Sequence, residues 1–94
     1  MNPLEELHAE YRRELPAKLE HLQALWSARQ LPELHRALHT LAGTAGSFGL
    51  RELSVAAREA ETYLEACGPA LDASQQAGLQ RLLEAICSPG ASGR

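Results

Sequence analysis

The sequence predicts an all-α fold, an up-and-down four-helix bundle with a short extra helix at its N-terminus. Its 94 residues include 17 Leu and 16 Ala against one Val, one Ile and three Thr, so strong helix formers greatly outnumber β-branched residues. Apolar residues recur at helical spacing in segments that short Pro- or Gly-containing connections separate. A chain of this length supports one core, and short connections between amphipathic helices favour antiparallel neighbours.

The first segment begins at Asn2, which resembles an N-cap, and Pro3, which suits the first turn of a helix. Pro16 interrupts the apolar stripe of this segment and has no backbone N–H to donate, so we expect a kink or a short break near residues 13–16. Such a break separates the short N-terminal helix from the first helix of the bundle. The stripe then resumes and ends at Trp26.

Three further helices follow. Pro32 begins the next one, and Gly49 ends it at a position typical of a left-handed C-terminal residue. Another apolar stripe begins at once with Leu50 and stops before Gly68, so these two helices form a tight hairpin. Asp72 resembles the N-cap of the last helix.

These boundaries divide the chain into one domain and a tail. We expect residues 1–87 to form a single helical domain and residues 88–94, which carry no apolar stripe, to form a flexible tail. An initial methionine together with such a tail favours a stand-alone protein over an excised domain.

Composition excludes several classes of protein. Nine basic against 12 acidic residues give a net charge of -3, the wrong sign for neutralising phosphates, and 4% aromatics provide no base-stacking platform, so no nucleic acid is expected as a partner. Neither a leader peptide nor a run of 18 apolar residues occurs, so we expect a cytoplasmic protein without membrane contact. We also expect a monomer. Cys67 and Cys87 stand far apart without metal-site spacing and are expected to be structural thiols.

One histidine of the helix that begins at Pro32 stands out. On a helical wheel His39 lies roughly 140° from the centre of the apolar stripe, so it should point into solvent. Ala42, Gly43 and Gly46 flank it and present almost no side chain. Each helical glycine costs roughly 1 kcal/mol relative to alanine, so bare backbone here needs a reason. Access of another protein to His39 is one reason, and close crossing of a neighbouring helix is the alternative.

The predicted hairpin supplies neighbours for this histidine. If the turn is centred near residues 49 and 50, position 61 lies opposite position 39, and position 58 lies opposite position 42. Glu61 is then placed to accept a hydrogen bond from one ring nitrogen of His39, leaving the other nitrogen free as a nucleophile. Arg58 and Arg36 are candidates for nearby positive charge, although each also fits an ordinary solvated surface position.

The run HTLAGTAGSFGL at residues 39–50, followed by Leu53 and Glu61, resembles the signature of histidine-containing phosphotransfer (HPt) domains. Its AGSFGL portion is similar to the phosphotransfer domain of chemotaxis kinases. The resemblance extends more weakly over residues 4–66. It implies a four-helix bundle whose exposed His39 takes a phosphoryl group from an aspartyl phosphate on a receiver domain and passes it to another receiver. Response-regulator receiver domains and a hybrid or chemotaxis-type histidine kinase are the implied partners.

The resemblance also implies roles for single residues. Gly43 leaves room for the receiver, and Glu61 matches the acid that hydrogen-bonds the active histidine in the chemotaxis kinases. The family usually has lysine three residues after the histidine, where this chain has Ala42. Arg58 is the obvious substitute as a charge partner for the phosphoryl group, with Arg36 second. The partner-docking face is expected to comprise His35, Ala42, Gly43 and Gly46.

The chemistry of phosphoryl transfer fits a carrier rather than an enzyme. Positioning and charge neutralisation provide most of the catalysis, commonly with a divalent metal. The sequence shows no metal-binding acid cluster, and no strand precedes the glycines at 43, 46 and 49 as a nucleotide-binding loop would require. We therefore expect no cofactor and no metal ligand in this chain, with Mg²⁺ supplied by the partner receiver.

Two alternatives remain at the level of sequence. The chain fits a helical adaptor that binds a receiver or kinase without being phosphorylated, and Ala42 favours that interpretation. A metal-binding helical bundle is a more distant alternative, because His35 and His39 stand at the i, i+4 spacing of zinc-binding helical pairs. Its weakness is that the sequence shows neither an acid beside the first histidine nor a third ligand.

Overall fold

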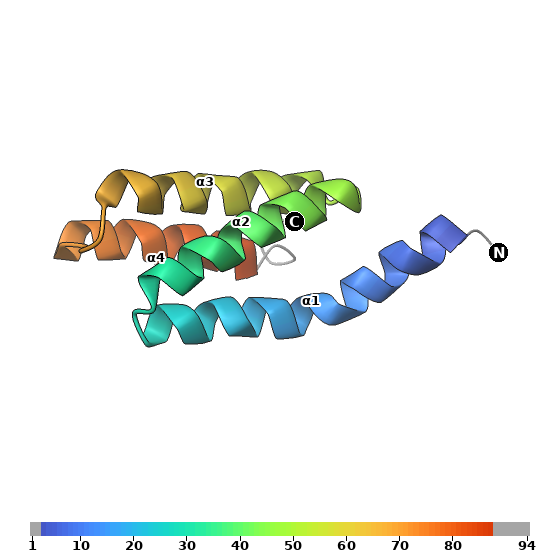
Figure 1. The fold of residues 1–94 in the computed structure, drawn as a ribbon, viewed down its shortest axis with the longest axis horizontal. Coiled ribbons are helices and arrows are strands. Elements are labelled where there is room, and N and C mark those ends of the chain that lie inside the picture. The colour runs from blue at the N-terminus through green and yellow to red at the C-terminus, as the bar shows by residue number, and fades with distance from the viewer. Residues whose placement is uncertain (1–2, 88–94) are drawn as a thin grey trace.

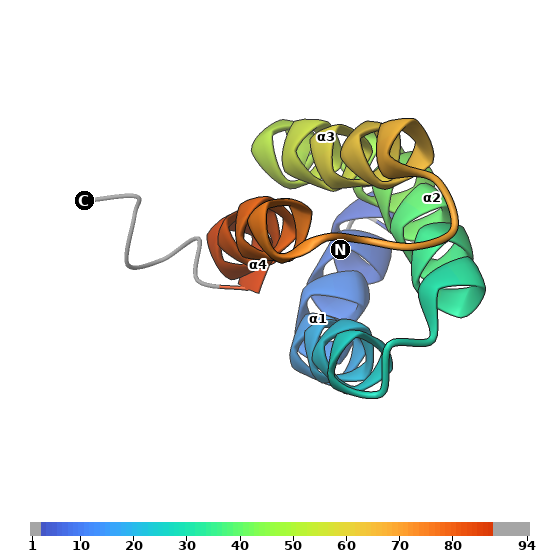
Figure 2. The same ribbon diagram turned by 90° about the vertical axis from the view of Figure 1, so that its left-hand side faces the viewer.

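The computed structural model describes residues 3–87, which form four helices and no strand (Figure 1). Figure 2, which looks along the long axis, shows the four helices arranged around a common centre. The predicted all-α bundle is confirmed. The expected tail at residues 88–94 lies outside the described residues. The helices are α1 (Pro3–Ser27), α2 (Leu31–Ser47), α3 (Arg51–Cys67) and α4 (Ala73–Cys87).

The separate short N-terminal helix is wrong, because α1 runs through Pro16 as one helix of 25 residues. Figure 1 shows α1 changing direction along its length instead of breaking. A proline inside a helix removes one hydrogen bond and crowds the preceding turn, and a bend relieves this strain without ending the helix. Tyr11 and Leu22, one on each side of Pro16, are both buried, so packing holds both halves of α1 in the helical state.

The expected helix ends are confirmed where glycine and a capping box predicted them. Gly49 and Gly68 have φ angles of 79° and 81°, in the left-handed region that favours glycine. Asp72 and Gln75 form a reciprocal capping box, because the Gln75 N–H donates to Asp72 Oδ1 at 2.7 Å and the Asp72 N–H donates to Gln75 Oε1 at 3.0 Å. These ends keep the connections short.

The core consists of leucine and alanine, with Trp26 and Ile86 as its other large members. Small residues allow α2 and α3 to pack closely, since Ala45, Ala57 and Ala60 are fully buried. This close pairing places the outward flank of α2, which includes His39, directly beside α3.

The N-terminal half of α1 is held to the end of α2. The rings of Tyr11 and Phe48 stack with centroids 4.5 Å apart, and the Tyr11 hydroxyl lies 2.7 Å from Thr44 Oγ1. Leu4 and Leu7 lie outside the core, with exposed fractions of 57% and 52%, because this end of α1 extends past the other helices (Figure 1). No helix within residues 3–87 has the length and apolar content that crossing a bilayer requires.

Leu38→Ala tests whether the core holds the site in place. Leu38 is fully buried next to His39, so we expect this variant to lose about 2–5 kcal/mol of unfolding free energy. Leu7→Ala removes the same atoms from an exposed position and is expected to lose less than about 1 kcal/mol. Urea denaturation followed by far-UV circular dichroism compares the two, and equal losses would contradict the packing described.

Candidate functional site

His39 lies midway along α2 on the flank that faces α3. Its side chain is 70% exposed, whereas Leu38 and Leu41 beside it are buried. The exposure expected from the helical wheel is therefore confirmed. An exposed imidazole on a rigid helix is accessible to another macromolecule and keeps a fixed position.

Glu61 on α3 holds this imidazole. Its Oε2 lies 2.8 Å from His39 Nδ1, and the residue is only 7% exposed, the one buried charged residue between residues 3 and 87. An ionised carboxylate can only accept, so Nδ1 carries the proton and donates. In the neutral ring Nε2 then has a free lone pair. The hairpin register that predicted position 61 opposite position 39 is confirmed by this contact.

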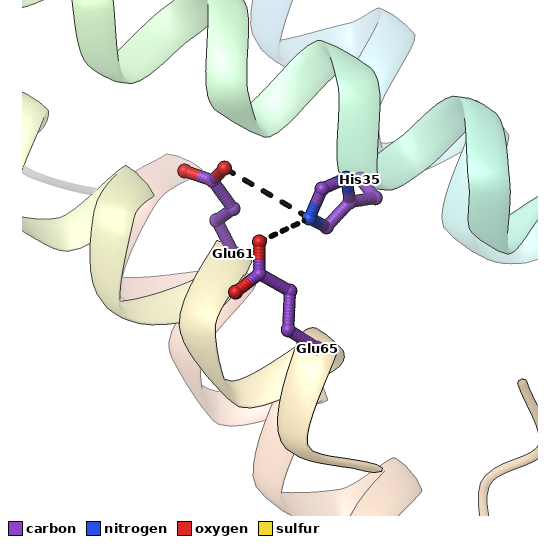
Figure 3. A group of neighbouring side chains, drawn as sticks. All are labelled: His35, Glu61 and Glu65. Atoms are coloured by element: carbon purple, nitrogen blue, oxygen red, sulfur yellow. Dashed lines mark hydrogen bonds and ion pairs between the residues drawn. The ribbon is translucent and has the colours of Figure 1, made fainter. Parts of the chain in front are cut away.

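A second histidine and a second glutamate join the same cluster. His35 lies one helical turn before His39, and its Nε2 is 2.7 Å from Glu65 Oε2 and 3.8 Å from Glu61 Oε2 (Figure 3). Glu65 follows Glu61 by one turn of α3, and His39 follows His35 by one turn of α2. Because the two helices run in opposite directions, His35 lies beside Glu65 and His39 lies beside Glu61. The same hairpin register places position 65 opposite position 35 and so contained a signal for Glu65, but its contact with His35 was not predicted.

These side chains border a shallow hollow between α2 and α3. Its volume is about 490 Å³. Arg36 is the one arginine that lines it, whereas Arg58, the first choice from the sequence, lines a different hollow with Tyr63 and Leu82 over α3 and α4. Arg36 is thus the cation that shares a hollow with His39. The lining residues are Pro32, His35, Arg36, His39, Glu61 and Glu65.

Ala42 does not belong to an exposed docking face. It is 1% exposed, and its carbonyl accepts a hydrogen bond from Ser54 Oγ at 2.7 Å. The expectation was wrong because α3 covers this flank of α2, which a wheel of one helix does not show. A Cβ on Gly46 would lie 3.2 Å from Ser54 Oγ, so at this position the close helix approach accounts for the glycine, although the residue stays exposed.

Gly43 behaves differently. It lies one turn after His39, is exposed, and a Cβ added to it would meet nothing within 4 Å. Neither a turn nor a helix contact within the described chain requires glycine here. Access of another protein to His39 stays the hypothesis for bare backbone at this position.

The two cysteines lie away from the hollow as free, half-buried thiols. Burial raises the pKa of the Cys87 thiol, an effect that a hydrogen bond with Gln23 partly offsets. Its Sγ lies 3.9 Å from the carbonyl oxygen of Leu19. Cys87 therefore stays a neutral thiol that joins α4 to α1, in agreement with the structural role expected for it.

Comparison with known proteins adds one finding. The family model described as the Hpt domain matches residues 6–88, well over half of the chain and including all of α2 and α3. Searches of curated proteins and of solved structures return no significant match.

Gly43→Ala and Gly46→Ala separate the two reasons for glycine. We expect Gly43→Ala to raise the free energy of unfolding by about 0.5–1 kcal/mol, because alanine is the better helix former and its Cβ meets open space. Gly46→Ala should gain less or lose stability, because Ser54 must move. Urea denaturation of both variants provides the comparison, and a destabilised Gly43→Ala would show that this glycine has a structural role.

Proposed function

The chain belongs to the Hpt domain family, and from this premise we propose that His39 is its phosphoacceptor, receiving a phosphoryl group from an aspartyl phosphate of one receiver domain and passing it to another. Hpt domains carry phosphoryl groups in two-component phosphorelays and are carrier modules rather than enzymes. Their partners in general are receiver domains and histidine kinases. The finer assignment depends on the geometry around one imidazole.

The observation that supports the proposal most strongly is the hydrogen bond between His39 Nδ1 and Glu61 Oε2. It leaves Nε2 unprotonated on a side chain that is 70% exposed. In the proposed step, the Nε2 lone pair attacks phosphorus, the bond from phosphorus to the aspartate oxygen breaks, and the carboxylate leaves with the electron pair. The proton on Nδ1 stays, and the Glu61 carboxylate stabilises the positive charge that the ring acquires.

The second transfer reverses these roles. An aspartate of the next receiver attacks phosphorus, the bond to Nε2 breaks, and the ring returns to its neutral form. Arg36 lines the hollow that contains His39 and is our candidate for the charge partner of the phosphoryl oxygens. The exposed, unobstructed Gly43 lies beside His39, where the receiver would dock.

In this proposal the receiver supplies Mg²⁺ and the remaining catalytic groups. Mg²⁺ prefers oxygen ligands and keeps several waters while it bridges phosphate to carboxylates, which suits a site on the receiver that holds the aspartyl phosphate. The carrier itself supplies a nucleophile, an orienting carboxylate and a docking face. We place the reaction in the cytoplasm and assign the carrier as a monomer, since each step joins one Hpt domain to one receiver.

A helical adaptor that is not phosphorylated is the second candidate. The family's usual lysine three residues after the histidine is replaced by Ala42, which is buried. Under this alternative the same face binds a receiver or kinase, but no group is transferred. Chemical labelling of the histidine distinguishes the two candidates.

Incubation with a phosphorylated receiver and Mg²⁺ tests the proposal. We expect acid-labile, base-stable phosphate on the full chain, and no label on His39→Gln, because glutamine offers no nucleophilic nitrogen. His21→Gln, which changes an exposed histidine of α1 outside the hollow, is the matched control and should label fully. If a panel of receivers labels neither the wild type nor this control, the result contradicts the carrier and favours the adaptor.

Arg36→Ala and Arg58→Ala test the charge partner. We expect Arg36→Ala to slow transfer about 10-fold or more, because a hydrogen bond to a charged group contributes about 1.5–3 kcal/mol. Arg58→Ala should change the rate less, because Arg58 lines the other hollow. Single-turnover transfer rates give the comparison. The reverse order would restore Arg58 as the substitute for the missing lysine.

A further inference from the structure

His35, which the sequence places on the docking face, and Glu65 take part in no chemical step of the proposed phosphotransfer, yet they point toward each other across the boundary of α2 and α3 (Figure 3). His35 Nε2, Glu61 Oε2 and Glu65 Oε2 all lie within 4.8 Å of one another. The sequence suggested a metal site through the spacing of His35 and His39 but offered no third ligand. The fold supplies two carboxylates from α3, so His35 has two further potential metal ligands beside it.

We propose that His35, Glu61 and Glu65 form a binding site for a divalent transition metal ion of the zinc class. An imidazole nitrogen and carboxylate oxygens are ligand types that bind zinc, and three protein ligands are the number found in open zinc sites, in which water takes the fourth position. Ligand bonds of about 2.0–2.2 Å in a tetrahedron separate neighbouring ligand atoms by roughly 3.3–3.6 Å. The distances from His35 Nε2 of 2.7 Å to Glu65 and 3.8 Å to Glu61 lie on either side of that range, so small side-chain movements close the site.

The charges favour a doubly positive ion. Two carboxylates within one cluster repel each other, and a divalent cation between them neutralises both while a neutral imidazole completes the set. The imidazole also selects the metal, because Mg²⁺ and Ca²⁺ prefer oxygen ligands, whereas zinc and its neighbours accept nitrogen.

The ligands differ in freedom, as an accessible site requires. Glu61 is fixed by burial, with 9% of its side chain exposed. His35 and Glu65 are 37% and 55% exposed, so an ion can enter from solvent and these two side chains can adjust around it. The helices themselves need not move, since each ligand pair already lies level across the α2–α3 boundary.

Metal binding has a consequence for His39, and this consequence rests on the proposed phosphotransfer. The Glu61 oxygen that lies in the ligand group is the same Oε2 that accepts the hydrogen bond from His39 Nδ1 at 2.8 Å. A bound cation draws electron density from this oxygen and weakens its hold on the imidazole. Metal binding and phosphorylation of His39 therefore oppose each other, because both depend on Glu61 Oε2.

Zinc titration of the full chain, read by competition with a chromogenic chelator, tests the site itself. We expect one zinc ion per chain, with binding at least about 10-fold weaker in His35→Gln and in Glu65→Gln, because each loses a ligand. Glu59→Gln changes an exposed glutamate of α3 outside the ligand group and should bind like the wild type. Absence of stoichiometric binding, or wild-type affinity in both ligand variants, would overturn the proposal.

His39→Gln separates this site from a simple histidine pair. His39 is not in the ligand group, so His39→Gln should retain zinc affinity within about 3-fold although it accepts no phosphate. Loss of binding in this variant would show that the ligands are the two histidines of α2 and would overturn the three-ligand assignment.

The coupling is tested by labelling with Mg²⁺ present, with and without zinc. We expect zinc to slow labelling of the wild type several-fold and to leave Glu65→Gln near its own zinc-free rate. Equal inhibition of both proteins would place the effect of zinc on the receiver and contradict the coupling. If the wild type takes no label even without zinc, the proposed phosphotransfer fails while the titration still decides whether the metal site exists.

Discussion

The hydrogen bond between His39 and Glu61 is the interaction on which the site depends. A buried carboxylate is costly without a partner, and Glu61 has one because it accepts a hydrogen bond from Nδ1 of an imidazole that is itself mostly exposed. The same contact sets the tautomer of His39. One hydrogen bond thus gives the buried carboxylate of α3 a partner and orients the exposed imidazole of α2.

Close packing of α2 against α3 sets the positions of His39 and Glu61. The contact requires α3 to lie beside the flank of α2, and alanines such as Ala45, Ala57 and Ala60 permit this distance because they add little bulk between the helices. The burial of Ala42 belongs to the same arrangement. Ala42 lies beneath α3 and offers no charge, whereas Arg36 lines the hollow that contains His39.

Much of this architecture could be predicted from the sequence, because the signals were local or depended on simple counting. The exposure of His39 follows from helical periodicity, and its pairing with Glu61 follows from a turn at Gly49. The errors arose where a second helix decides the outcome. Ala42 is covered by α3, and packing on both sides of Pro16 keeps α1 a single helix.

The short connection between α2 and α3 has a consequence for how the chain tolerates change in length. Only Phe48, Gly49 and Leu50 separate the two helices, so the pairing of His39 with Glu61 is set by the number of residues between them. One inserted residue would shift that pairing by about 100° around α3. Within residues 3–87, Tyr63 of α3 packs against the bare backbone of Gly78 in α4, but no ion pair like that of His39 and Glu61 joins these two helices. The protein should therefore tolerate insertions and deletions between α3 and α4 better than between α2 and α3.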